Sequence, residues 1–113
     1  MKEVNAQYLT CPIRQVLSRI SDKWSILVLF LLDTSETGIL RFSELHRNMT
    51  DCSQKKLSQT LRNLEAHHLV SREVFPVVPP RVEYSLTEMG KSLMPSLHGL
   101  VSWAQVNFRD VVT

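Results

Sequence analysis

The sequence predicts a mainly α-helical fold that carries one small β-hairpin, because its hydrophobic periodicity is helical on both sides of one short segment with the period of a strand. Before residue 67 and after residue 87, apolar residues recur at helical steps of three and four. Between Arg81 and Leu86, apolar and polar residues alternate instead, which is the period of a strand. A helix with one polar face that is followed directly by a hairpin is the layout of a winged helix-turn-helix.

Three further helices are predicted in the first half of the chain. The first covers about residues 11–20 and begins at Cys11, because the proline that follows favours the first helical position. The second runs from Trp24 to Leu31, is apolar nearly all round and therefore belongs at the centre of the fold. The third spans Arg41 to Met49. The segment Asp33 to Gly38, rich in turn formers, is the expected flexible loop.

The helix predicted at about residues 53–66 has two contrasting faces. Ser53 is suited to cap its N-terminus, because a serine hydroxyl accepts a backbone N–H of the first turn. Leucines spaced at i, i+4 and i+7 form an apolar stripe, and long polar side chains project from the other side. Lysine and arginine donate to guanine, glutamine bonds adenine, and all of them can hold phosphate. The stripe is Leu57, Leu61 and Leu64; the expected DNA-binding residues are Ser53, Gln54, Lys55, Lys56, Gln59 and Arg62.

The hairpin predicted at about residues 70–87 would form the wing. Its first strand ends at Pro76, and Pro79 and Pro80 stiffen the tip. Arg81 follows this tip directly, where a cation is placed to enter a minor groove or to contact a phosphate. Arg81 therefore joins the expected DNA-binding residues, although a solvated arginine is the simpler reading.

The C-terminal segment of about residues 88–111 is predicted to form a long amphipathic helix, kinked at Pro95. A chain this small has no core left to cover so much apolar surface, so we expect pairing with the N-terminal helix of a second copy. These two helices, about residues 11–20 and 88–111, are therefore the expected dimerisation helices. A twofold homodimer would present two reading helices to a palindromic operator, about 34 Å apart.

Length and charge agree with a small DNA-binding domain. The 113 residues form one expected domain, 1–113, with a formal charge of only +2. From Ser53 to Arg81, however, five cations accompany two acids, so the basic excess is local. The polar N-terminus is not that of a signal peptide, and the apolar run Ile26 to Leu32 is too short to span a membrane. We expect a soluble cytoplasmic protein with reduced cysteines and no membrane association.

Catalysis, cofactors and metals are not expected. The chain has three glycines and no glycine-rich phosphate loop, and no nucleophile, base and orienting group are linked by spacing. His46, His67, His68 and Cys52 show no ligand spacing typical of zinc. The sequence therefore predicts a protein that is not an enzyme and binds neither a cofactor nor a metal ion.

Seven short segments spread along the chain form a characteristic series: Cys11-Pro12, Asp22-Lys23-Trp24, Arg41-Phe42-Ser43-Glu44-Leu45, Ser53-Gln54-Lys55, Leu57-Ser58-Gln59, Leu64-Glu65 and Val78 to Thr87. Through these segments the chain resembles the HxlR-type winged-helix transcriptional regulators, relatives of the MarR group, over essentially its whole length. The resemblance implies a dimeric transcription factor, often a repressor of a neighbouring gene, with a recognition helix from Ser53 and a wing around Pro79. The chain departs from the family pattern at Ser21, in its long loop at Asp33 to Gly38, and at Thr50 to Cys52.

The two cysteines receive different interpretations. In several members of this family, a cysteine at the place of Cys11 senses electrophiles or oxidants. A position at a helix N-terminus close to Arg14 would itself favour a reactive thiolate. The alternative is a small buried hydrophobic residue. Cys52 is expected to fill the core beside the reading helix, with a second thiol switch, or a resolving partner for Cys11, as its sharper alternative.

Two other functions remain open beside a thiol-switched DNA-binding regulator. One is a regulator gated by a small molecule, with structural cysteines and an apolar pocket at the dimer seam near Trp24, Tyr8 and Trp103. The other is a winged-helix module that binds an acidic protein through Lys55, Gln59 and Arg62. The possible effector is accordingly a small molecule or an oxidant.

Overall fold

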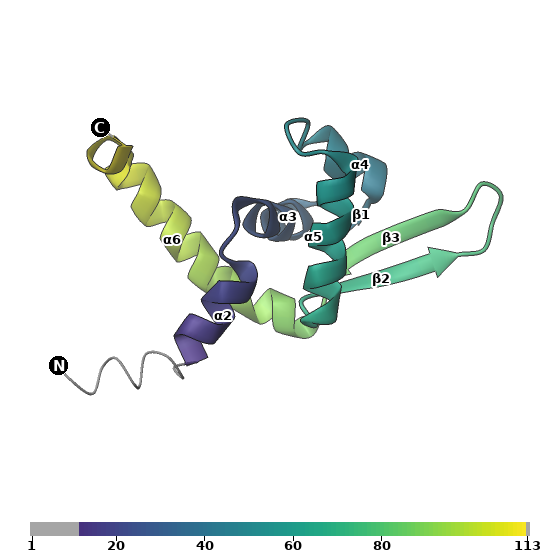
Figure 1. Cartoon of the computed structure of the whole chain (residues 1–113), viewed down its shortest axis with the longest axis horizontal. Helices are drawn as coiled ribbons and strands as arrows, with labels where there is room; N and C mark the ends of the chain where they lie inside the picture. Colours follow the sequence, from purple (N-terminus) through teal and green to yellow (C-terminus); the bar gives the residue numbers. More distant parts are fainter. Residues whose placement is uncertain (1–11, 113) are drawn as a thin grey trace.

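The fold is a bundle of helices attached to a three-stranded antiparallel sheet (Figure 1). The computed structural model describes residues 12–112. The fold class predicted from the sequence, mainly α-helical with a β-wing, is confirmed. In chain order the elements are α2 (Pro12–Ile20), α3 (Lys23–Thr34), β1 (Ile39–Arg41), α4 (Phe42–Arg47), α5 (Gln54–Ala66), β2 (Val70–Phe75), β3 (Arg81–Leu86) and α6 (Glu88–Val112).

The segment around Arg41 differs from the prediction. Arg41 is the last residue of β1 and not the first of a helix, and α4 ends at Arg47, before Met49. Strand β1 pairs with β3, Leu40 lying opposite Tyr84, so that β3 is the central strand of the sheet. Three residues are too few to show alternation, and β1 is held by a strand far away in sequence. The preceding loop ends at Gly38, whose φ of 74° is readily adopted by glycine.

Helix α3 lies at the centre of the hydrophobic core, as the apolar sequence predicts. It packs against α5, α6 and β3. Val28 and Leu29 are completely buried, whereas Trp24 is half-buried and packs at the margin of the core. Buried leucines of α4 and α5 complete this core, so the helix-turn-helix is built directly on α3.

The N-terminus of α3 is stabilised by Asp22, which predicts a pH dependence. Burial raises the pKa of the Asp22 carboxyl, but hydrogen bonds from Ser25, the nearby Lys56 charge and the Trp24 backbone together outweigh it and leave this pKa below its ordinary value. The carboxylate accepts the Ser25 backbone N–H at 2.9 Å and its hydroxyl at 2.7 Å. A group with a lowered folded-state pKa contributes stability above about pH 4, and this is lost as the pH falls through the folded pKa.

We therefore expect the free energy of unfolding of the unchanged protein to decrease on acidification by more than that of Asp22→Asn. Asparagine also caps helices well but carries no charge that can be lost. Urea unfolding of both proteins at a series of pH values from about 6 down to 2 measures the difference. Parallel stability curves for the two proteins would show that the ionised Asp22 carboxylate does not contribute.

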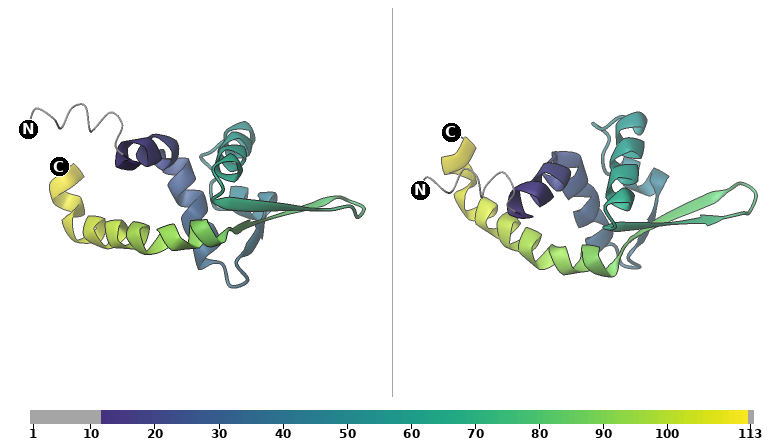
Figure 2. Two further views of the ribbon diagram at one scale, coloured as in Figure 1. Left: turned by 90° about the horizontal axis from the view of Figure 1, so that it is seen from below. Right: turned by 60° about the horizontal axis from the view of Figure 1, so that its bottom comes forward.

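Helix α6 begins at a tight junction with the sheet and then leaves the body of the molecule. The Thr87 hydroxyl accepts the Gly90 backbone N–H at 2.9 Å and donates to the His68 carbonyl at 2.6 Å. Figures 1 and 2 show that the axis of α6 changes direction after its first turns. Pro95 lies inside the helix and cannot supply a backbone N–H, which accounts for a bend without a break.

Large apolar side chains of α2 and α6 are exposed. On α6, Trp103 is 57% and Phe108 is 61% exposed, and on α2 Ile13 is 67% exposed. The C-terminal part of α6 extends away from the core (Figure 2). Among residues 12–112, no helix is long and apolar enough to cross a membrane.

Candidate nucleic-acid interface

Helix α5 is held firmly by its N-cap and by its apolar side. The Ser53 hydroxyl accepts the Lys56 backbone N–H at 3.0 Å, as the sequence predicts for an N-cap. Leu57, Leu61 and Leu64 are buried against the core, and Thr60 is buried beside them with its hydroxyl donating to the Lys56 carbonyl. These contacts determine which side of α5 faces outward.

The outward face of α5 carries long hydrogen-bond donors. Lys55, Gln59 and Arg62 are exposed and recur at i, i+4 and i+7, so they form one row opposite the buried leucines. In the part of the chain that the structure describes, none of these three side chains makes a hydrogen bond or an ion pair. Gln54 and Lys56 are exposed in the first turn. The structure thus brings Lys55, Gln59 and Arg62 together on one accessible surface, with Gln54 and Lys56 on either side of it.

Asn63 falls on the polar side of α5 by helical spacing, but its side chain is directed toward α2. Its amide Nδ2 donates to the Arg19 carbonyl of α2 at 3.4 Å. This contact joins α5 to α2, although Asn63 stays exposed. Helical geometry alone put it on the polar side, and only the position of α2 separated it from that row.

The turn between α4 and α5 is also built from specific contacts. His46 Nε2 lies 2.9 Å from the Cys52 carbonyl, which ties the end of α4 to the start of α5. The Cys52 side chain is 2% exposed, as expected for a core residue. Burial raises the pKa of the Cys52 thiol, and the nearby Asp51 charge acts in the same direction. A buried thiol with a raised pKa is a poor nucleophile.

The wing is a regular hairpin whose cations are all restrained. Strands β2 and β3 pair from Val70 opposite Leu86 to Phe75 opposite Arg81. The Arg81 guanidinium lies over the Phe75 ring, 4.5 Å from its centroid, and its Nε is 3.1 Å from Glu83 Oε2. This Nε is buried and its approach to Glu83 lacks hydrogen-bond geometry. Arg81 therefore lies along the base of the tip and does not extend beyond it.

The remaining residues discussed for this interface lie on the wing, outside the described residues, or in the sheet. Arg72 of β2 pairs with Glu65 of α5, Nε to Oε1 at 3.6 Å, and so links the wing to α5. Cys11 lies outside the described residues. Within residues 12–112, no group of three or more His, Cys, Asp or Glu side chains is placed to hold a metal ion. Sequence reasoning did not select Arg41, because its place opposite Glu83 of β3 depends on sheet register.

Comparisons with known proteins agree with this arrangement. The profile of the HxlR-like helix-turn-helix family matches residues 19–111. An HTH-type transcriptional regulator of Methanothermobacter thermautotrophicus is 46% identical over 100 residues, 88% of this chain and 73% of the relative.

Two solved structures have similar folds. The redox regulator HypR in its reduced form is 39% identical, covers 89% of this chain and 96% of its own, and has a TM-score of 0.80. The reduced transcriptional regulator YodB from B. subtilis is 32% identical, covers 83% of this chain and 90% of its own, and has a TM-score of 0.71. This chain belongs to the HxlR-like helix-turn-helix family of DNA-binding transcriptional regulators.

Proposed function

We propose that the protein binds a specific duplex operator as a homodimer and represses transcription, with α5 reading the major groove. The observation that carries this proposal is the row of Lys55, Gln59 and Arg62, which stands opposite a fully buried leucine stripe. A recognition helix needs free donors on a rigid support, and both are present. Ser53, Gln54 and Lys56 would contact phosphates at the start of α5, and Arg81 would contact the backbone from the wing.

The exposed apolar surfaces of α2 and α6 support the homodimer. Ile13 and Trp103 belong to helices at the end of the molecule opposite the wing (Figure 1). Several large apolar side chains exposed on neighbouring helices indicate an association surface, and a second copy of the chain would bury them. The resulting twofold symmetry matches a palindromic operator, each half-site being read by one α5.

We further propose that oxidation of Cys11 controls DNA binding. HypR is described as a redox regulator and has been solved in oxidised and reduced forms, and YodB has been solved after diamide treatment. Cys52 is unsuited to this role, since burial raises the pKa of its thiol. If Cys11 thiols of two protomers formed a disulfide, an oxidant such as diamide would take up the two electrons and two protons released.

Fluorescence anisotropy with the intergenic DNA upstream of the protein's own gene tests both the DNA binding and its control by Cys11. We expect specific binding that weakens with salt, is lost after diamide treatment and returns with reductant. Cys11→Ser should bind DNA but no longer respond to diamide, whereas the control Cys52→Ser should respond like the unchanged protein. Specific binding in which Cys11→Ser still responds would contradict the thiol switch alone. Absence of any specific duplex binding would contradict the DNA-binding function and favour a protein partner.

A second candidate for control is a small-molecule effector, favoured by one apolar hollow of about 420 Å³. It lies between α2, the end of α5 and α6, and is a different place from the pocket expected near Trp24, Tyr8 and Trp103. Tyr8 lies outside the described residues. Val16, Leu69 and Leu93 form apolar walls, with Arg19 and His67 among the lining residues. A regulator gated there would keep its response in Cys11→Ser.

A further inference from the structure

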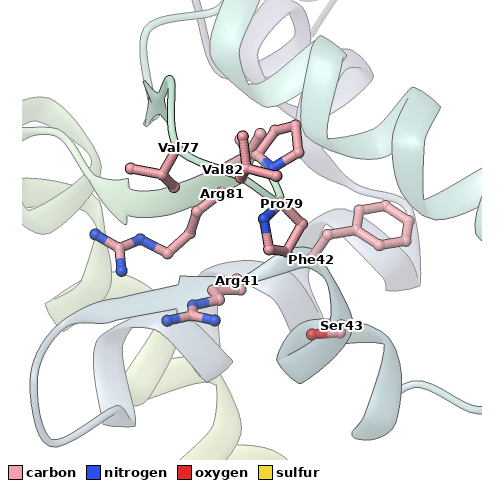
Figure 3. A pocket seen from close by; sticks show the side chains of 9 residues that line it. Arg41, Phe42, Ser43, Val77, Pro79, Arg81 and Val82 are labelled. Carbon is pink, nitrogen blue, oxygen red and sulfur yellow. The ribbon is translucent and has the colours of Figure 1, made fainter.

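A hollow separates the wing from the start of α4 (Figure 3). Its volume is about 540 Å³, and one wall is the tip of the hairpin from Val77 to Val82. The opposite wall is formed by Arg41, Phe42 and Ser43, at the junction of β1 and α4. The hollow thus lies between two parts of the chain that the β1–β3 pairing brings together.

The hollow carries two guanidinium groups. Figure 3 shows the Arg41 and Arg81 side chains extending to the same side of it, one from each wall. Arg81 is positioned by the Phe75 ring beneath it. Arg41 is exposed, and among the residues that the structure describes its guanidinium makes no ion pair. Two cations that line one open hollow are suited to an anion.

Nearby carboxylates oppose this positive charge, but none of them lines the hollow itself. Glu83 lies opposite Arg41 in the sheet register and pairs with Arg81. Glu73, on the outer strand, is opposite Glu83. Glu44 Oε1 accepts the Arg41 backbone N–H at 2.9 Å, so this carboxylate is held at the start of α4. Arg47 lies close to Arg41 in an adjoining hollow and adds a third cation.

We propose that Arg41 and Arg81 together hold one phosphate of the DNA backbone in this hollow. The proposal rests on the DNA-binding function proposed above. In a helix-turn-helix the first helix, here α4, crosses the DNA backbone while the second, here α5, enters the major groove. In that geometry the β1–α4 junction lies beside the phosphates of one DNA strand. Every nucleotide carries the same phosphate, so the contact does not depend on the base sequence. It adds Arg41 to the interface.

The test uses anisotropy titrations of a random-sequence duplex over a range of salt concentrations. Arg41→Gln should weaken binding about fivefold to tenfold and lower the slope of log affinity against log salt by about 1. Lys91→Gln, which removes an exposed cation of α6, should leave the slope unchanged. Arg41→Lys keeps the charge and should restore the slope. Circular dichroism checks that each variant is folded.

Two further variants test whether Arg41 and Arg81 contact the same phosphate. If Arg41 and Arg81 hold one phosphate, Arg41→Gln combined with Arg81→Gln should lose less affinity than the product of the two single losses. Glu83→Gln removes a competing carboxylate and should tighten binding about threefold, which a purely structural role would not cause. Strictly multiplicative losses, or an Arg41→Gln slope equal to that of Lys91→Gln, would overturn the inference while DNA binding stands. Failure of the unchanged protein to bind any duplex at low salt would overturn it together with the proposed function.

Discussion

Gly90→Ala is expected to destabilise the protein by about 3 kcal/mol, although alanine is the better helix former. A Cβ atom at Gly90 would overlap the Leu69 carbonyl oxygen and lie 3.2 Å from its carbonyl carbon. This carbonyl also accepts the Thr87 backbone N–H at 3.1 Å, so it cannot move without loosening the start of α6. Urea unfolding measures the effect as a fall in the midpoint.

Gly99→Ala is the matched control, because it changes the same residue type in the same helix. Nothing lies within 4 Å of a Cβ atom at Gly99, so only helix propensity should act. We expect this variant to be more stable by about 0.5–1 kcal/mol. If both substitutions raised the midpoint equally, the close approach of α6 to Leu69 would be wrong.

Lys55→Ala and Arg62→Ala are each expected to weaken specific operator binding by about 1–3 kcal/mol if their side chains read bases. Both donors are exposed and unengaged in the described structure, so their removal should leave the fold unchanged. Anisotropy titrations with the upstream intergenic DNA and with a random duplex measure the loss of discrimination between them. Lys91→Ala serves as the control for removal of a charge.

The two DNA titrations separate base reading from phosphate contact. A base-reading side chain loses affinity mainly for the specific duplex, whereas a phosphate contact weakens both duplexes by a similar factor. Unchanged affinity of both variants for the specific duplex would rule out α5 as the recognition helix. Equal losses of affinity for both duplexes would mean that α5 contacts the DNA backbone and that other residues read the bases.

The strongest local patterns in the sequence were sufficient to predict most elements. The leucine stripe of α5, the Ser53 cap and the proline-bounded hairpin each depend on neighbours within a few residues, and all three are present. The core role of Cys52 also followed from residue type, since free cysteines are usually buried. The roles of the α5 and wing residues in DNA binding remain predictions.

The sequence by itself determined the fold class, helix α5 and its polar row, because hydrophobic periodicity and capping act between residues close in the chain. Only the tertiary structure decided the features that depend on distant segments. It placed β1 beside β3, turned Asn63 toward α2, and drew Arg81 back over Phe75. It also set Arg41 across a hollow from the wing. Register between distant strands and packing between helices depend on how separate segments meet, and no local pattern in the chain encodes that meeting directly.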